Sequence, residues 1–92
     1  MAERFIHVGF NFRGGPEKIS ELVPVFNKAL DWYRYAPNCW ILWTNSTPRE
    51  WYSRLKPLID DEDYLFICEL EIKSRSGWLP REAWDWLRKH GD

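Results

Sequence analysis

The order of strand-like and helix-like hydrophobic patterns is the feature that most restricts the fold of this chain. Residues 4–12 place Ile6 and Val8 on one side of an extended backbone and Phe5 and His7 on the other. Alternation with a period of two predicts a strand whose two faces both carry apolar side chains. The first element is therefore a strand that is buried, at least in part, on both sides.

A helix is predicted after the turn Gly14-Gly15-Pro16. Residues 16–30 place Leu22 and Phe26 on one stripe, at the spacing of an amphipathic helix. Pro24 interrupts this pattern, since an interior proline removes a backbone hydrogen bond at a cost of about 3 kcal/mol. We expect the helix either to start late, near Ser20, or to be kinked.

Two strands joined by a short turn are predicted over residues 31–44. This segment is rich in aromatic and β-branched residues, which favour strands, and is broken by Ala36-Pro37-Asn38. Trp40 and Leu42 fall on one face of the second strand, and Ile41 and Trp43 fall on the other. This segment therefore forms a β-hairpin.

A capping box opens the next helix. Thr47 can accept from the backbone at Glu50, the Glu50 side chain can reach back to the cap, and Pro48 suits the first helical position. This helix turns Trp51 and Leu55 inward, together with Leu58 and Ile59, and Pro57 limits its length. The acidic turn 60–63 follows, and residues 64–72 are predicted to form a fourth strand.

The resulting order is strand, helix, strand, strand, helix, strand. Right-handed crossovers fold this order into an α+β, ferredoxin-like (βαββαβ) sheet of four antiparallel strands with two helices on one face. We expect one domain over residues 1–92, with a ferredoxin-like body over residues 4–72. Residues 77–91 are predicted to add a short Trp-rich helix, with Pro80 in its first turn and Gly91 past its end.

Composition excludes several classes of protein. Aromatic residues make up 17% of the chain, and seven are Trp, which favours a packed core over disorder. No apolar run is long enough for a membrane span, and the N-terminus lacks a secretory pattern, so we expect a cytoplasmic protein without a membrane partner. Cys39 and Cys68 lie singly in apolar stretches and predict neither a disulfide nor a zinc site. No cofactor is expected.

The second face of the predicted sheet is apolar and needs a cover. An exposed apolar face of this kind commonly marks an interface, and twofold pairing is the commonest solution for a small protein. We therefore expect a homodimer, with the C-terminal helix as the alternative cover. The predicted interface residues are Phe5, His7, Asn11, Trp40 and Trp78.

The body of the chain resembles the small CRISPR-associated Cas-two family and its VapD-like and SinR-like bacterial relatives. The resemblance is carried by the first strand HVGFNF, the hairpin ending WILWTN, the capped helix TPREWYSRLKPLID and the segment DYLFICEL. It implies a homodimer of ferredoxin-like fold, in a phage-defence, CRISPR or toxin–antitoxin setting. The fold by itself does not imply a function.

Some members of that family are metal-dependent nucleases that use an Asp near the end of the first strand. The matching position here is Asn11, and an amide is a poor ligand for a hard divalent cation. We therefore expect a non-catalytic interaction module. The alternative is an endoribonuclease that uses Mg²⁺ or Mn²⁺, with Asp31 or Glu69 in place of the missing Asp.

A nucleic-acid or partner surface is a further hypothesis. Cations interleaved with aromatic residues can contact phosphates while the rings stack on bases, although the same rings also fit a core. An RNA-recognition domain of the same topology is disfavoured, because the strand CWILWT lacks the motif of that class. The predicted contact residues are Arg13, Arg34, Arg49, Arg54 and Lys56.

Overall fold

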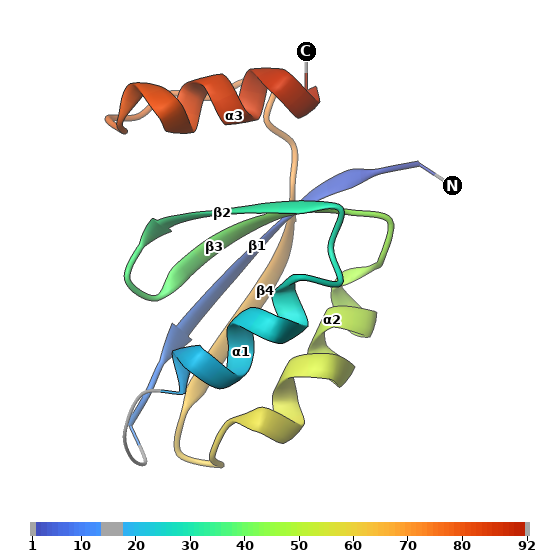
Figure 1. Ribbon diagram of the computed structural model, residues 1–92, viewed down its shortest axis with the longest axis vertical. Helices are drawn as coiled ribbons and strands as arrows, with labels where there is room; N and C mark the ends of the chain where they lie inside the picture. Colours follow the sequence, from blue (N-terminus) through green and yellow to red (C-terminus); the bar gives the residue numbers. More distant parts are fainter. Residues whose placement is uncertain (1, 14–17, 92) are drawn as a thin grey trace.

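The computed structural model describes residues 2–13 and 18–91, and within them an α+β fold of four strands and three α-helices (Figure 1). The strands are β1 (Arg4–Asn11), β2 (Asp31–Ala36), β3 (Cys39–Thr44) and β4 (Tyr64–Leu70). The helices are α1 (Ile19–Phe26), α2 (Pro48–Leu55), which continues into the short 3-10 helix η1 (Lys56–Leu58), and α3 (Arg81–Gly91). The turn predicted at Gly14-Gly15-Pro16 lies outside the described residues.

The four strands form one open antiparallel sheet in the order β2-β3-β1-β4. The central strand β1 pairs with β3 on one side and with β4 on the other, so that Ile6 lies opposite both Leu42 and Glu69. Figure 1 shows α1 and α2 on one face of this sheet and α3 on the opposite face. The predicted hairpin and the antiparallel four-stranded sheet are confirmed.

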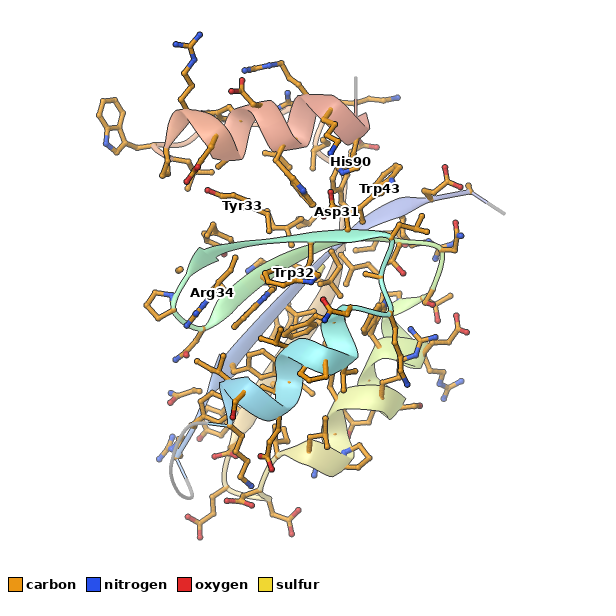
Figure 2. All side chains as sticks on the ribbon, viewed as in Figure 1. Asp31, Trp32, Tyr33, Arg34, Trp43 and His90 are labelled. Carbon is orange, nitrogen blue, oxygen red and sulfur yellow. The ribbon has the colours of Figure 1, made fainter. Side chains whose placement is uncertain are left out.

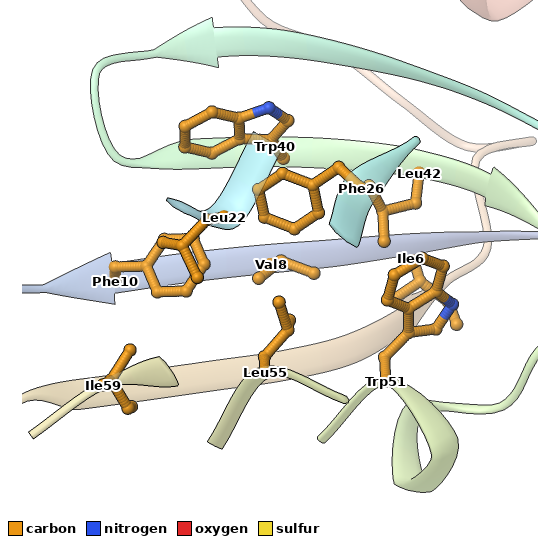
Figure 3. Packing of buried hydrophobic residues seen from close by; sticks show 10 residues of the cluster. All are labelled: Ile6, Val8, Phe10, Leu22, Phe26, Trp40, Leu42, Trp51, Leu55 and Ile59. Carbon is orange, nitrogen blue, oxygen red and sulfur yellow. The ribbon is translucent and has the colours of Figure 1, made fainter. Parts of the chain in front are cut away.

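The main core lies between the sheet and the helices α1 and α2 (Figure 3). Even-numbered residues of β1 and β3 face these helices, as the period of two requires. Two indoles are fully buried there, one from the sheet and one from α2. The buried members of this core are Ile6, Val8, Phe10, Leu22, Phe26, Trp40, Leu42, Trp51, Leu55 and Ile59.

Helix α1 starts late, as one of the two alternatives for Pro24 predicts. It begins at Ile19, and Lys18 in the N-cap position makes no side-chain capping bond. Leu22 and Phe26 are fully buried. Burial of one apolar stripe rather than good local capping therefore holds this short helix in place.

Helix α2 has the predicted capping box. The backbone N–H of Glu50 donates to Thr47 Oγ1 at 3.2 Å, and the backbone N–H of Thr47 donates to Glu50 Oε1 at 2.9 Å. Further along the helix, the Trp51 indole N–H donates to the buried Thr44 Oγ1 at 3.2 Å. The helix is thus fixed at its start by local sequence and in its middle by a tertiary hydrogen bond.

Helix α3 begins one residue after Pro80, so the proline precedes the helix instead of lying in its first turn. Gly91 is the last helical residue and not the residue after the end. A Cβ atom at Gly91 would lie 2.6 Å from Ile72 Cδ1 and 3.1 Å from Phe5 Cε2, so a larger residue there would require these side chains to shift. Among the residues that the structure describes, no helix has the length and apolar character needed to cross a membrane.

Candidate interaction surface

Helix α3 covers only part of the second face of the sheet, opposite α1 and α2. Leu87 of α3 packs with Phe5 and Ile41 into a second buried cluster. The C-terminal helix therefore covers the part of the face that it reaches. This helix was the alternative to a second copy in the prediction from the sequence. Half-buried residues around this cluster are Tyr35, Trp43, Leu70, Ile72, Trp84 and Trp86.

Asp31, the first residue of β2, ties the C-terminal end of α3 to the sheet. Its Oδ2 accepts from Trp86 Nε1 at 3.0 Å and lies 2.8 Å from His90 Nε2, while its Oδ1 accepts from the Trp32 backbone N–H at 2.8 Å. Lys89 Nζ lies 3.9 Å from the same carboxylate. Burial raises the pKa of Asp31, but the hydrogen bonds from His90, Trp32 and Trp86 outweigh it and hold the pKa below the ordinary 3.8.

Figure 2 shows how alternate residues of β2 point to opposite sides of the sheet. Asp31 and Tyr33 lie between the sheet and α3, together with Trp43 and His90, whose rings stack at 5.3 Å. Arg34 lies on the other side, over the Trp40 ring. Asp31 and Tyr33 of β2 thus contribute to the attachment of α3.

The part of the second face built from β1 and β4 carries exposed aromatic rings. Tyr64 and Phe66 are 59% and 64% exposed, and they pair with Asn11 and Gly9 of β1. Residues at these paired positions share one face, because side chains directly opposite in an antiparallel pair point the same way. We call this surface the open half-face; its residues are His7, Gly9, Asn11, Tyr64, Phe66 and Cys68.

His7 and Tyr35 form a neutral pair at the border between the covered and open parts. His7 Nε2 lies 2.6 Å from the Tyr35 hydroxyl. Burial lowers the pKa of His7, while burial and then a hydrogen bond with Cys39 raise the pKa of Tyr35 to about 12. Tyr35 therefore stays protonated, and its hydroxyl can donate a hydrogen bond to a neutral imidazole. This pair places no charge on the face.

The five predicted contact cations do not form a single surface. Arg13 lies two residues beyond the end of β1, with its guanidinium 4.6 Å from the centre of the Tyr64 ring, and Arg34 donates to the carbonyl of Pro37 beside the hairpin turn. The other three belong to α2 and η1: Arg54 packs over Trp51, Lys56 pairs with Asp61, and Arg49 is exposed. Of the five, only Arg13 borders the open half-face.

The five predicted interface residues are divided among four environments. Trp40 is fully buried under α1, which corrects its placement at an interface, because its ring offers no surface to a partner. Phe5 is buried beneath α3. His7 and Asn11 belong to the open half-face, and Trp78, which precedes α3, is 99% exposed.

The residues considered for metal chemistry lie apart from one another. Asp31 and Glu69 belong to the two opposite edge strands, and they hold His90 and Arg4, respectively. Asn11 is an exposed amide at the end of β1. Within residues 2–13 and 18–91, no three His, Cys, Asp or Glu side chains are grouped closely enough to hold a metal ion.

A pocket of about 230 Å³ opens at the C-terminal end of α3. Its walls come from the start of β1, the end of β4 and the last turn of α3, and they mix Arg4 and Lys73 with three glutamates. His90, which lines it, is already engaged by Asp31. The mixed charge of the walls does not select a ligand class.

Two features of this surface were not predicted from the sequence. The exposure of Tyr64 and Phe66 has only a weak signal, since YLFICEL reads as a strand without saying which face stays open. The contact between Asp31 and His90 joins residues 59 positions apart and has no local signal.

Comparisons with protein families, characterised proteins and solved structures find no match for this chain.

Proposed function

We propose that this chain is a non-catalytic, homodimeric interaction module of ferredoxin-like (βαββαβ) topology that acts in the cytoplasm. The order of elements and the strand order β2-β3-β1-β4 support the topology, together with the position of α1 and α2 on one face. The Cas-two-like kinship, with its phage-defence or toxin–antitoxin setting, stays a prediction from resemblance.

The observation that carries the proposal is the open half-face. It exposes Tyr64 and Phe66 next to the covered cluster, and solvent-exposed aromatic rings on the face of a sheet favour contact with another protein. None of its six residues is acidic or basic apart from the largely neutral His7, whose pKa is lowered by burial. A second copy can therefore meet the same surface about a twofold axis without like-charge repulsion.

This interface is smaller than the sequence suggested. A second copy was expected to cover the second face, with the C-terminal helix as the alternative cover, whereas α3 occupies only the part around Phe5 and Ile41. A second copy would therefore pack beside α3, on β1 and β4. The contact would depend on a few aromatic residues, which commonly dominate the free energy of such interfaces.

Sedimentation equilibrium at about 10 to 100 µM protein tests the dimer, since association follows mass action. We expect the wild type to dimerise and the double variant Tyr64→Ser/Phe66→Ser to lose about thirtyfold or more in dimer affinity. Leu30→Ser is the matched control, because Leu30 is also exposed but lies between α1 and β2. A monomeric wild type throughout this range would refute the homodimer.

The alternative function, a metal-dependent endoribonuclease, has a separate test. Purified protein is incubated with labelled RNA and Mg²⁺ or Mn²⁺, beside an Asn11→Asp variant that restores the carboxylate of the resembling family. The non-catalytic proposal expects no cleavage by the wild type. If metal-dependent cleavage co-purifies with the wild-type chain and is lost in Asp31→Asn or Glu69→Gln, the endoribonuclease function would replace the non-catalytic proposal.

A further inference from the structure

Strand β4 has an open edge whose backbone groups can be assigned. It is the last strand on its side of the sheet, with no further strand beside it among the described residues. The Phe10 N–H donates to Asn38, on the β3 side of β1, so the odd-numbered residues of β1 bond to β4. The backbone N–H and C=O groups of their partners Tyr64, Phe66 and Cys68 point toward β1. The backbone N–H and C=O groups of Leu65, Ile67 and Glu69 therefore point away from the sheet, at its open edge.

This edge lacks several of the features that usually prevent strand addition. Edge strands are commonly protected by Lys, Pro, a bulge or a short length. The opposite edge strand, β2, has an irregularity between Arg34 and Ala36 and carries that arginine. By contrast, β4 has seven residues in regular register with β1, and contains neither Lys nor Pro.

The acidic residues around β4 outnumber the cations that pair with them. Residues 57–72 contain six acidic residues and no Lys or Arg: four precede the strand, and Glu69 and Glu71 lie at its other end. Lys18 and Lys56 pair with Asp60 and Asp61 at the first end, and Arg4 pairs with Glu69 at the other, so that part of this charge is compensated at both ends. A second β4 paired antiparallel would bring the acidic start of one copy to the acidic end of the other, and a nucleic acid would be repelled as well.

We propose that the edge of β4 binds an extended segment of a partner protein, with apolar residues at alternate positions and Lys or Arg at both ends, as a fifth strand. Backbone hydrogen bonds to Leu65, Ile67 and Glu69 give the affinity of such strand addition, and side chains give its specificity. One row of the segment's side chains lies beside Tyr64 and Phe66, and its basic ends lie beside the acidic ends of β4. The inference rests on the proposed role as an interaction module.

A labelled peptide tests this inference on the full chain. The probe is a fluorescein-labelled nonapeptide with two lysines at each end and alternating valine and threonine between them, followed by fluorescence anisotropy. Two matched peptides separate charge from strand pairing: one has glutamates in place of the lysines, and one has a central proline. We expect saturable binding of the lysine peptide, binding at least about tenfold weaker for the glutamate peptide, and none for the proline peptide.

Two variants at one exposed position separate the same effects in the protein. Glu69→Gln removes a charge and should weaken binding about threefold, as for a rim charge. Glu69→Pro also removes an outward N–H while leaving the bonds to β1 in place, and should weaken binding about tenfold more. Glu21→Gln on α1 is the control and should bind like the wild type. Circular dichroism of each variant checks that it is folded.

Hydrogen exchange locates the contact even if a variant fails to fold. The lysine peptide should slow the exchange of the amides of Leu65, Ile67 and Glu69 in the wild type. Equal binding of the lysine and proline peptides, no binding of the lysine peptide, or protection elsewhere would overturn the inference. The inference would also be overturned if these three amides were already protected in the protein alone and the peptide did not change that protection, because a second copy would then occupy the edge.

The two proposals fail separately. A dimer that does not bind the lysine peptide removes the strand-addition inference and leaves the homodimer proposal intact. If the protein is a monomer that binds the peptide, and the peptide protects the three amides, the homodimer proposal is removed and the strand-addition inference stands.

Discussion

At the scale of individual residues, the carboxylate of Asp31 joins β2 to α3. It accepts from the Trp32 backbone and from Trp86, and it contacts His90. These hydrogen bonds stabilise the ionised form, which is why the pKa of Asp31 lies below 3.8 in spite of burial. The attachment of α3 should therefore depend on pH on the acidic side.

The sign of this dependence follows from the lowered pKa. A carboxyl whose folded pKa is depressed stabilises the fold fully above its unfolded pKa, and the effect is lost as the pH falls from about 3.8 through the lower folded pKa. Asp31→Asn should lower the free energy of unfolding at pH 6 by at most about 1 kcal/mol, because the side chain is partly exposed. Urea unfolding followed by Trp fluorescence at pH 6 and pH 3 measures it.

Asp85→Asn, on the exposed side of α3, is the control for this prediction and should change stability less at both pH values. We expect the difference between wild type and Asp31→Asn to shrink at pH 3. A difference of the same size at both pH values would show that the charge of Asp31 does not hold α3.

At the scale of elements, α1 and α2 are stabilised in different ways. α2 starts with a complete capping box, whereas α1 has no side-chain cap and contains Pro24. Both are eight residues long, too short to be stable alone, and both are held by burial of one stripe. The capping box therefore adds a local contribution that α1 lacks.

Thr47→Ala should lower the free energy of unfolding by about 1 kcal/mol, because the backbone N–H of Glu50 loses its acceptor at the start of α2. Thr47→Ser keeps a hydroxyl and should lose much less. Chemical unfolding of the three proteins measures this difference. Equal losses for Ala and Ser would mean that the methyl group of Thr47, and not its cap, accounts for the effect.

At the scale of the whole molecule, α3 decides how much of the sheet is available to a partner. It buries Phe5 and Ile41 through Leu87, and it leaves Tyr64 and Phe66 open. The chain thus has two sheet surfaces on one side, one closed by its own C-terminal segment and one exposed. The homodimer and strand-addition proposals concern the exposed one.

Leu87→Ala should lower the free energy of unfolding by about 2 kcal/mol, at the low end for a buried leucine because the site lies at the edge of the fold. It should also increase binding of the dye ANS, since loosening α3 exposes the apolar face beneath it. Arg88→Ala, at the next and exposed position, is the control. Unchanged stability and dye binding in Leu87→Ala would show that α3 does not act as the cover.

Local patterns account for the parts of the fold that the sequence predicted. The alternation in residues 4–12 assigned Val8 and Phe5 to opposite faces, and Thr47 with Glu50 marked the start of α2. These signals arise from the repeat of the backbone itself, two residues in a strand and 3.6 in a helix, so a short window contains them. The predicted inward face of Trp51 follows from the same periodicity and is confirmed.

The sequence by itself therefore determined the elements, their order and the two faces of each strand. Only the tertiary structure decided which part of the second face α3 covers, that Trp40 lies in the main core, and that Asp31 meets His90. The reason is physical: the faces of an element follow from its own repeat, whereas the partner of each face depends on how distant segments pack, and no local pattern contains that choice.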